Sequence, residues 1–303
     1  MRFKGLGIAI VLLLALWVGT SAQQAPAEQF RYRFEPNNQS RYHVSAQMSG
    51  TLPLFGGLPV QKVLVEMTMV LKVRQVRPDG NAELGMDIEA FKAEMDGQAL
   101  PLPLERLRAS VRDLLYVVNP QGEVVERKGA GVLPFNLPVP GVEVSQLPLL
   151  VLQLVFPKEP ISSDREWVYS RVMTSVPNDT PAQFTARWLK DEPLNGLSAS
   201  LFSQKMRWSR SFKADIFDQP TADESLMVKQ IEQSVTGEAQ IWFNRQEGKL
   251  LKATLNAQYV QQTRQLNPSE SSAEPTSVQL TAKVQITRED LGPRETETKQ
   301  TGT

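Results

Sequence analysis

The sequence predicts a mostly β fold in which long antiparallel strands form one or more curved sheets or a half-open barrel, with one or two short helices. Two observations predict it. Apolar and polar residues alternate over long stretches, a pattern typical of strands with one buried face. Short segments rich in Pro, Gly, Asn and Asp separate these stretches, and such residues favour the tight turns of antiparallel hairpins.

The clearest predicted hairpin lies between residues 63 and 90. Apolar residues alternate with charged or hydroxyl residues over 63–73 and again over 82–90, on either side of the turn segment Pro78-Asp79-Gly80-Asn81. The same pattern predicts further hairpins and strands at 117–125, 239–260, 167–176, 184–189 and 278–286. Several of these strands exceed the usual five or six residues, so we expect a broad curved sheet.

Two stretches have helical spacing. Leu104, Leu107 and Val111 recur at intervals of three and four residues, and so do apolar residues over 147–155, where Ser145 is a candidate N-cap. The second stretch follows a segment rich in Gly and Pro, and its apolar side chains could cover the open face of a sheet.

The chain therefore divides into five predicted parts. These are a signal peptide (1–22), a first β-rich half (23–128), a Pro/Gly-rich linker with a short apolar helix (129–160), a second β-rich half (161–288) and a disordered tail (289–303). The two halves suggest a two-fold repeat, although no fixed-period identity supports it. Whether they make one domain or two is left open.

The first residues have the order of a secretory signal peptide. Arg2 and Lys4 precede an apolar run over 6–18, and small residues follow up to Ala22, where we expect cleavage, with Ala27 as a second position. The alternative is an uncleaved anchor, although the run is shorter than the roughly 20 residues that a spanning helix needs. The sequence thus predicts export to the periplasm, the cell envelope or the medium, with no transmembrane span after cleavage.

The composition excludes several kinds of catalytic, metal-binding and nucleic-acid-binding site. The 33 basic and 33 acidic residues balance, so no net charge attracts nucleic acid, and we expect none as a partner. The chain has no Cys and a single histidine, His43, which excludes a thiol nucleophile and a zinc site of several imidazoles. Phosphate-binding, dinucleotide and nucleophile-elbow motifs are also absent; a near miss at 196–200 is interpreted as a loop. We predict no catalytic, metal-binding or cofactor-binding residue and no cofactor.

Acidic and aromatic residues supply the remaining candidates. Glu83, Asp87 and Glu89 share one face of a predicted strand, which fits either a calcium site or, as we favour, a solvated sheet face. Tryptophans gather in the second half, where they either pack in the core or line a ligand-binding surface. The candidate ligand-binding residues are Trp167, Trp188, Trp208, Trp242, Leu150 and Leu154. The basic, aromatic run 207–210 is too short to indicate a nucleic-acid site.

The order of these features resembles that of exported bacterial β-rich proteins of uncharacterised function. The resemblance rests on the strand start at 42–44, the Asp79-Gly80 hairpin, the apolar Pro-rich middle, the segment 164–167 and the late hairpin at 243–248. It spans most of the mature chain, its motifs are generic, and it transfers no site residue. A more distant similarity, to the curved sheets of periplasmic lipoprotein carriers, implies a groove that holds acyl chains.

Two functions follow as hypotheses. The first is an exported, non-enzymatic protein that binds an apolar ligand or an envelope protein partner. The alternative is a carboxylate-based hydrolase that acts on an envelope polymer.

Overall fold

The computed structural model describes the chain in eight stretches. These are residues 27–54, 58–101, 103–129, 154–163, 165–172, 180–216, 227–266 and 277–292. The predicted signal peptide, Leu150, most of the predicted linker and most of the predicted tail lie outside the described residues.

The described chain is mostly β and contains one helix. The strands are β1 (Gln39–Leu54), β2 (Leu58–Val76), β3 (Ala82–Met95), β4 (Gln98–Ala99), β5 (Leu115–Val118), β6 (Val124–Lys128), β7 (Glu166–Arg171), β8 (Ala182–Leu194), β9 (Leu197–Ile216), β10 (Met227–Asn244), β11 (Lys249–Leu266) and β12 (Ser277–Asp290), and the helix is α2 (Leu104–Val111). The described part of the chain contains no helix with the length and hydrophobicity that a membrane-spanning segment requires.

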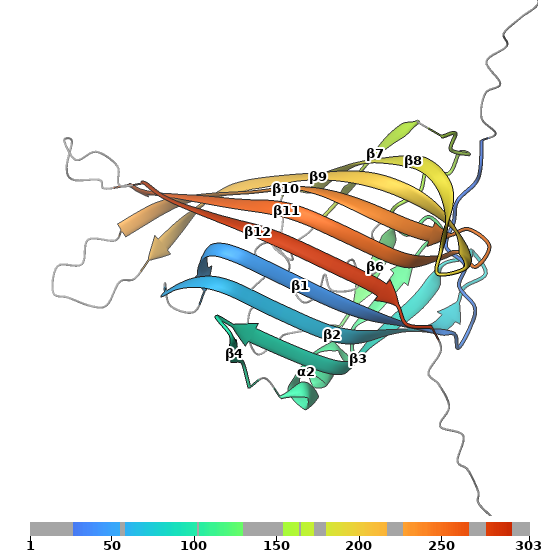
Figure 1. Ribbon diagram of the computed structural model, residues 1–303, viewed down its shortest axis with the longest axis horizontal. Coiled ribbons are helices and arrows are strands. Elements are labelled where there is room, and N and C mark those ends of the chain that lie inside the picture. The colour runs from blue at the N-terminus through green and yellow to red at the C-terminus, as the bar shows by residue number, and fades with distance from the viewer. Residues whose placement is uncertain are drawn as a thin grey trace, which may run out of the picture.

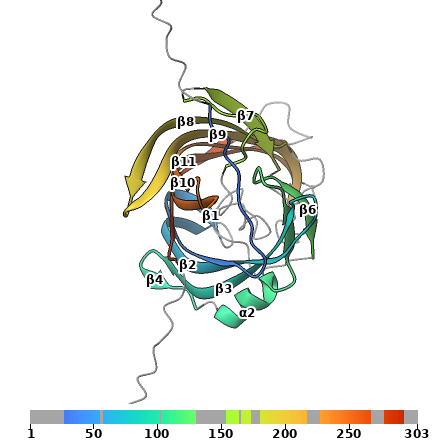
Figure 2. The ribbon, with the colours of Figure 1, turned by 90° about the vertical axis from the view of Figure 1, so that its right-hand side faces the viewer.

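All twelve strands belong to one antiparallel sheet, as predicted (Figure 1). The order is β6-β5-β3-β2-β1-β12-β11-β10-β9-β8-β7, with β4 paired to β3. The first half therefore runs from the centre to one edge, and the second half runs from the other edge back to the centre, where β1 pairs with β12. Among the described strands, β6 and β7 do not pair with each other, so the sheet they form is open. Seen end-on, it curls around an interior, with β6 and β7 as the last described strand on either side (Figure 2).

The predicted hairpins are confirmed with their turns. In the β2–β3 hairpin, Val76 pairs with Ala82, and the Arg77 N–H donates to the Asn81 carbonyl at 2.7 Å. Gly80 has a φ of +84°, a conformation that glycine adopts without steric cost. The hairpins at 117–125 and 239–260 correspond to β5–β6 and β10–β11. The segment 196–200 is not a loop throughout, because β9 begins at Leu197.

The first predicted helix is confirmed as α2. It lies along β3 between the part of β3 that pairs with β5 and the part that pairs with β4, and it buries Leu107 and Val111. Most of the second predicted helix, over 147–155, lies outside the described residues. Its described end, Leu154 and Val155, is not helical.

The inner and outer faces of the sheet differ as the alternating pattern requires. In β2, Val63, Val65 and Met67 point inward and are buried. The acidic residues of β3 point outward and pair with basic side chains: Glu83 with Arg77 at 2.6 Å, Asp87 with Lys72 and Arg108 at 3.5 and 3.3 Å, and Glu89 with Arg41 at 2.9 Å. Each predicted candidate for calcium coordination is thus an ion-pair partner on a polar outer face.

Two non-strand segments cross one end of the curled sheet. We call residues 28–34 the strap and residues 154–161 the crossing segment. They pair with each other between Glu28 and Ile161, with both backbone hydrogen bonds at 2.8 Å. The strap also hydrogen-bonds to the turn carbonyls of Pro120 and Gly248, at 2.7 and 3.0 Å. The dark-blue start of the chain in Figure 2 shows this crossing. The strap therefore ties the β5–β6 turn to the β10–β11 turn.

We expect Gly122→Ala to destabilise the protein by about 2–4 kcal/mol. Gly122 has a φ of +89°, and a Cβ there would lie 2.3 Å from the Tyr32 ring and 2.6 Å from the Leu154 carbonyl. The left-handed backbone alone costs alanine about 1 kcal/mol, and the clash with the strap adds roughly 1–3 kcal/mol.

Gly97→Ala is the matched control for this measurement. Gly97 has a φ of +81° and nothing within 4 Å of the added Cβ, so we expect only the backbone cost of about 1 kcal/mol. Both variants are compared by urea unfolding followed by circular dichroism. Equal losses of stability would contradict the packing role of the strap.

Candidate functional site on the inner face

Aromatic side chains fill the end of the sheet that the strap crosses. We call this set the aromatic cluster; its members are Phe30, Tyr32, Phe156, Trp167, Trp188, Phe202 and Phe243. Phe156 lies at its centre, with ring centroids 4.9 Å from Phe243 and 5.6 Å from Phe202. Both contacts are edge-to-face, the geometry that the charge distribution of aromatic rings favours. The cluster leaves Phe30, Phe156, Phe202 and Phe243 at most 2% exposed, so this end of the interior is packed solid.

Further along β9, β10 and β11, the inner face becomes less tightly packed. Because alternate residues face inward, the register places the next apolar positions side by side, with Val235 opposite Trp208 and Tyr259. We call the apolar residues of this stretch the apolar band: Met206, Trp208, Val235, Leu255 and Ala257. Trp208 is buried, and the other four are half-buried.

At the level of the apolar band, the outer positions of the same strands are polar. Lys205, Thr236 and Gln258 alternate with residues of the apolar band and are exposed. At the level of the apolar band, half-buried apolar side chains therefore face the inside of the curl, and the outer positions between them carry polar ones.

Beyond the apolar band, polar side chains from three strands form a network on the inner face. We call Arg210, Gln233, Tyr259 and Gln261 the polar patch. Arg210 Nε donates to Gln233 Oε1 at 2.6 Å, and Gln233 Nε2 donates to Tyr259 Oη at 2.9 Å and to Gln261 Oε1 at 2.8 Å. The patch lies about 26 Å along β9 from Phe202, since a strand rises about 3.3 Å per residue.

The guanidinium of Arg210 is fixed by its neighbours on β9. Its Cζ lies 5.3 Å from the centre of the Trp208 ring and 4.8 Å from that of the Phe212 ring. Both distances permit cation–π attraction. Phe212 shares this inward face of β9 with Trp208 and Arg210, lies furthest of the three from the aromatic cluster, and is 37% exposed.

Two tyrosines on the inner face, Tyr169 and Tyr259, have a raised pKa. Burial raises the pKa of Tyr259 to about 12, although the hydrogen bond from Gln233 and the charge of Arg210 act in the opposite direction. Tyr259 therefore stays neutral at physiological pH and donates to Gln261 Oε1 at 2.6 Å. Burial likewise raises the pKa of Tyr169 to about 12, and its hydroxyl donates to Gln204 at 3.0 Å.

This arrangement is chemically suited to holding an amphipathic molecule. The apolar band offers dispersion and hydrophobic contact, and the adjoining polar patch offers an arginine and neutral amide and hydroxyl groups. Within the part of the chain that the structure describes, no group of three or more His, Asp or Glu side chains could hold a metal ion.

The structure brings together only some of the predicted ligand-binding residues. Trp167 and Trp188 belong to the aromatic cluster and Trp208 to the apolar band. Leu154 is fully buried in the crossing segment. Trp242 does not join them: it alternates with the buried Ile241 and Phe243, lies on the outer face and donates to Glu192 at 2.7 Å.

Sequence reasoning missed the polar patch. In the sequence Arg210 stands out only as part of the basic run 207–210, and the structure places Arg207 on the outer face, away from Arg210. The available signal was polar residues at inward positions of otherwise alternating strands, namely Gln233 in β10 and Gln261 in β11.

Comparison with known proteins adds little to this geometry. No family model matches the chain, and no curated protein matches it. Among solved structures, a lipovitellin chain, from work on lipid–protein interactions in lipovitellin, matches with a TM-score of 0.45 and 11% sequence identity. The match covers 86% of this chain and 26% of that one, so the chain spans about a quarter of the lipovitellin chain. A likeness this distant carries no structural or functional argument.

We expect the protein to lose stability progressively as the pH rises from about 10 to 12. Burial raises the pKa of Tyr116, Tyr169 and Tyr259 from 10.0 to about 12. Above pH 10 the unfolded chain loses these protons while the folded chain keeps them, so ionisation favours unfolding. The check is a titration of tyrosinate absorbance, in which three of the five tyrosines should ionise near pH 12 while the protein is folded. Ionisation of all five near pH 10 in the folded protein would contradict the assigned burial.

Proposed function

We propose that this is an exported, non-enzymatic protein that binds an amphipathic, largely apolar molecule on the inner face of its open sheet. The observation that supports this most directly is the order of surfaces along β9–β11. A sealed aromatic cluster is followed by a half-buried apolar band and then by the polar patch. A ligand with an apolar body and a polar end matches that order.

The apolar band provides the driving force. Each 100 Å² of apolar surface removed from water contributes about 2.5 kcal/mol, and a chain-like ligand lying along the band would remove such surface from both partners. Arg210 and the amides of Gln233 and Gln261 would then orient the polar end, because buried polar groups of a ligand need hydrogen-bond partners. A protein partner and a carboxylate-based hydrolase are the other hypotheses, and no described contact favours either of them.

Export is part of this proposal and rests on the order of residues 1–22. We expect the protein recovered from the cell envelope or medium of a bacterial host to begin at Gln23, after removal of those residues. Intact-mass measurement checks this. A full-length mass in the recovered protein would contradict cleavage.

We expect Val235→Lys to weaken binding of a fluorescent fatty acid by about tenfold or more. Val235 lies in the middle of the apolar band, and an ammonium group there would have to be desolvated against the apolar body of the ligand. The measurement is a fluorescence titration of purified protein, after lipid extraction and mass spectrometry have identified any molecule that co-purifies.

Thr236→Lys is the matched control. It introduces the same charge one residue further along β10, on the exposed outer face, and should leave the affinity within about twofold of wild type. Thermal unfolding of both variants verifies that they fold. The proposal is wrong if wild-type protein binds no fatty acid, or if the two lysine variants bind it equally well.

A further inference from the structure

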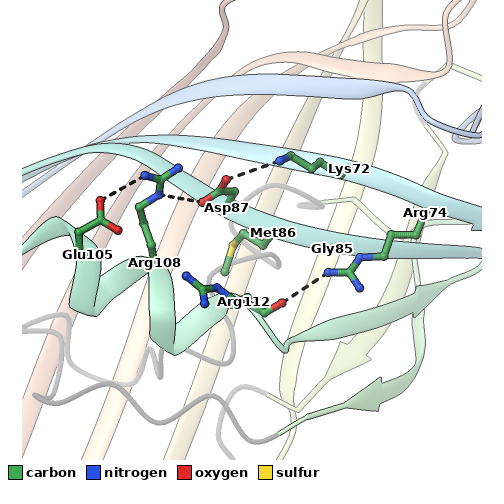
Figure 3. Close-up of a pocket in the computed structure, with 8 residues that line it drawn as sticks. All are labelled: Lys72, Arg74, Gly85, Met86, Asp87, Glu105, Arg108 and Arg112. Atoms are coloured by element: carbon green, nitrogen blue, oxygen red, sulfur yellow. Dashed lines mark hydrogen bonds and ion pairs between the residues drawn. The ribbon is translucent and has the colours of Figure 1, made fainter.

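A cationic pocket lies on the outer side of the sheet, between α2 and strands β2 and β3 (Figure 3). Its volume is about 300 Å³, and its lining residues are Lys72, Arg74, Gly85, Met86, Asp87, Glu105, Arg108 and Arg112. Helix α2 turns Leu107 and Val111 toward the core, and the helical repeat therefore brings Glu105, Arg108 and Arg112 to the pocket.

The charges in this pocket do not cancel. Four cationic side chains face two carboxylates. Asp87 is shared between Lys72 Nζ at 3.5 Å and Arg108 Nε at 3.3 Å, and Glu105 pairs with Arg108 at 3.2 Å. Both carboxylates are thus engaged by Lys72 and Arg108.

Asp87 remains ionised in this setting. Burial acts to raise the pKa of Asp87, but hydrogen bonds from Arg108 and from the Ile88 N–H outweigh it and hold the pKa below its usual value. The formal charges of the lining side chains sum to two positive units, from four cationic side chains and two carboxylates.

Arg74 and Arg112 provide that excess. Among the described residues, neither guanidinium has a carboxylate oxygen within 4.0 Å. Arg74 is nonetheless held in place: its Nη2 donates to the Arg112 carbonyl at 3.4 Å.

Gly85 allows Arg74 to take this position. A Cβ at residue 85 would lie 2.8 Å from Arg74 Nε and 3.3 Å from Arg74 Nη2. The side chain of Arg74 therefore passes directly over the glycine, and any larger residue would displace it.

We propose that this pocket binds a phosphate group between the guanidinium groups of Arg74 and Arg112. A guanidinium presents parallel N–H donors that match the oxygens of a phosphate, and a doubly charged anion would balance the net charge of the pocket. Lys72 and Arg108 add attraction while they stay paired with Asp87. The pocket opens on the outer face, so the proposal does not depend on a ligand at the inner face.

The phosphate could belong to a free anion or to a lipid headgroup, and the experiment separates these sources. Inorganic phosphate is titrated into the mature protein, with no residue after the cleavage position removed, by isothermal titration calorimetry. In a second arm, the protein is sedimented with phosphatidylcholine vesicles that contain or lack phosphatidic acid. Arg74→Gln and Arg112→Gln should each weaken phosphate binding by about tenfold, since loss of one charge-assisted hydrogen bond has about that effect.

Two further variants test the geometry. Gly85→Ala keeps every charge but displaces Arg74, and it should weaken phosphate binding in the same direction as Arg74→Gln. Arg106→Gln removes a cation from the exposed surface of α2 outside the pocket, and it should leave binding unchanged.

The outcomes divide as follows. Phosphate binding that depends on Arg74, Arg112 and Gly85 but not on Arg106 supports the proposal, and vesicle binding with the same dependence assigns the phosphate to a lipid headgroup. Absence of phosphate binding to the wild-type protein overturns the proposal. Equal binding by all four variants overturns it as well, because the attraction would then come from surface charge in general.

Discussion

The structure depends above all on how its open sheet is sealed at one end. A curled antiparallel sheet that does not close leaves its apolar inner face accessible to water and the backbone N–H and C=O groups of its edge strands unpaired. Other segments must bury that face and cover those edges. Here the strap and the crossing segment insert Phe30, Tyr32 and Phe156 into the curl. Their backbones hydrogen-bond to turns that belong to different halves of the chain. The aromatic cluster therefore does two things at once: it fills one end of the interior, and it fixes the distance between the two halves of the sheet.

The two halves contribute different chemistry to the interior. In the first half, the inward positions are almost uniformly apolar and include four buried methionines, Met48, Met67, Met69 and Met86. Methionine is flexible and polarisable, and it adapts to irregular neighbours. In the second half, the inward positions of β9–β11 change from the aromatic cluster through the apolar band to the polar patch. The first half of the sheet thus provides a wall of flexible apolar side chains, and β9–β11 provide a wall whose apolar band ends at the polar patch. This asymmetry matches a ligand with a polar head and an apolar tail.

The sequence predicted features that depend on nearby residues and missed those that depend on register. The alternation over 63–73 and 82–90 and the turn residues Asp79 and Gly80 are local, and the β2–β3 hairpin follows from them. The leucine spacing at 104–111 is also local, and α2 forms there. The strap has its own alternation at Phe30, Tyr32 and Phe34, but its partners in the crossing segment and the β10–β11 turn lie more than a hundred residues away, and no local pattern reveals them.

The candidate site shows the same limit. The alternation of Ala239, Ile241 and Phe243 already places Trp242 on the other face, so that tryptophan could have been set apart from the sequence alone. The polar patch could not have been assembled in this way, because Arg210, Gln233 and Gln261 lie on three strands. A slip of one residue between any two of these strands would move one member to the outer face.

The outer pocket follows from the way the edge of β3 is covered. β3 pairs with β5 near one end and with β4 near the other, and α2 occupies the stretch between them. A helix with its side chains is about 10 Å across, whereas neighbouring strands lie only about 4.8 Å apart, so α2 cannot lie flush in the plane of the sheet. A hollow over Gly85 and Asp87 is the geometric consequence. Apolar residues would fill such a hollow and extend the core, but this chain lines it with the cationic side chains of Arg74, Arg108 and Arg112. Helix α2, which lies along the edge of β3, thus also forms one wall of a pocket in which cationic side chains outnumber carboxylates.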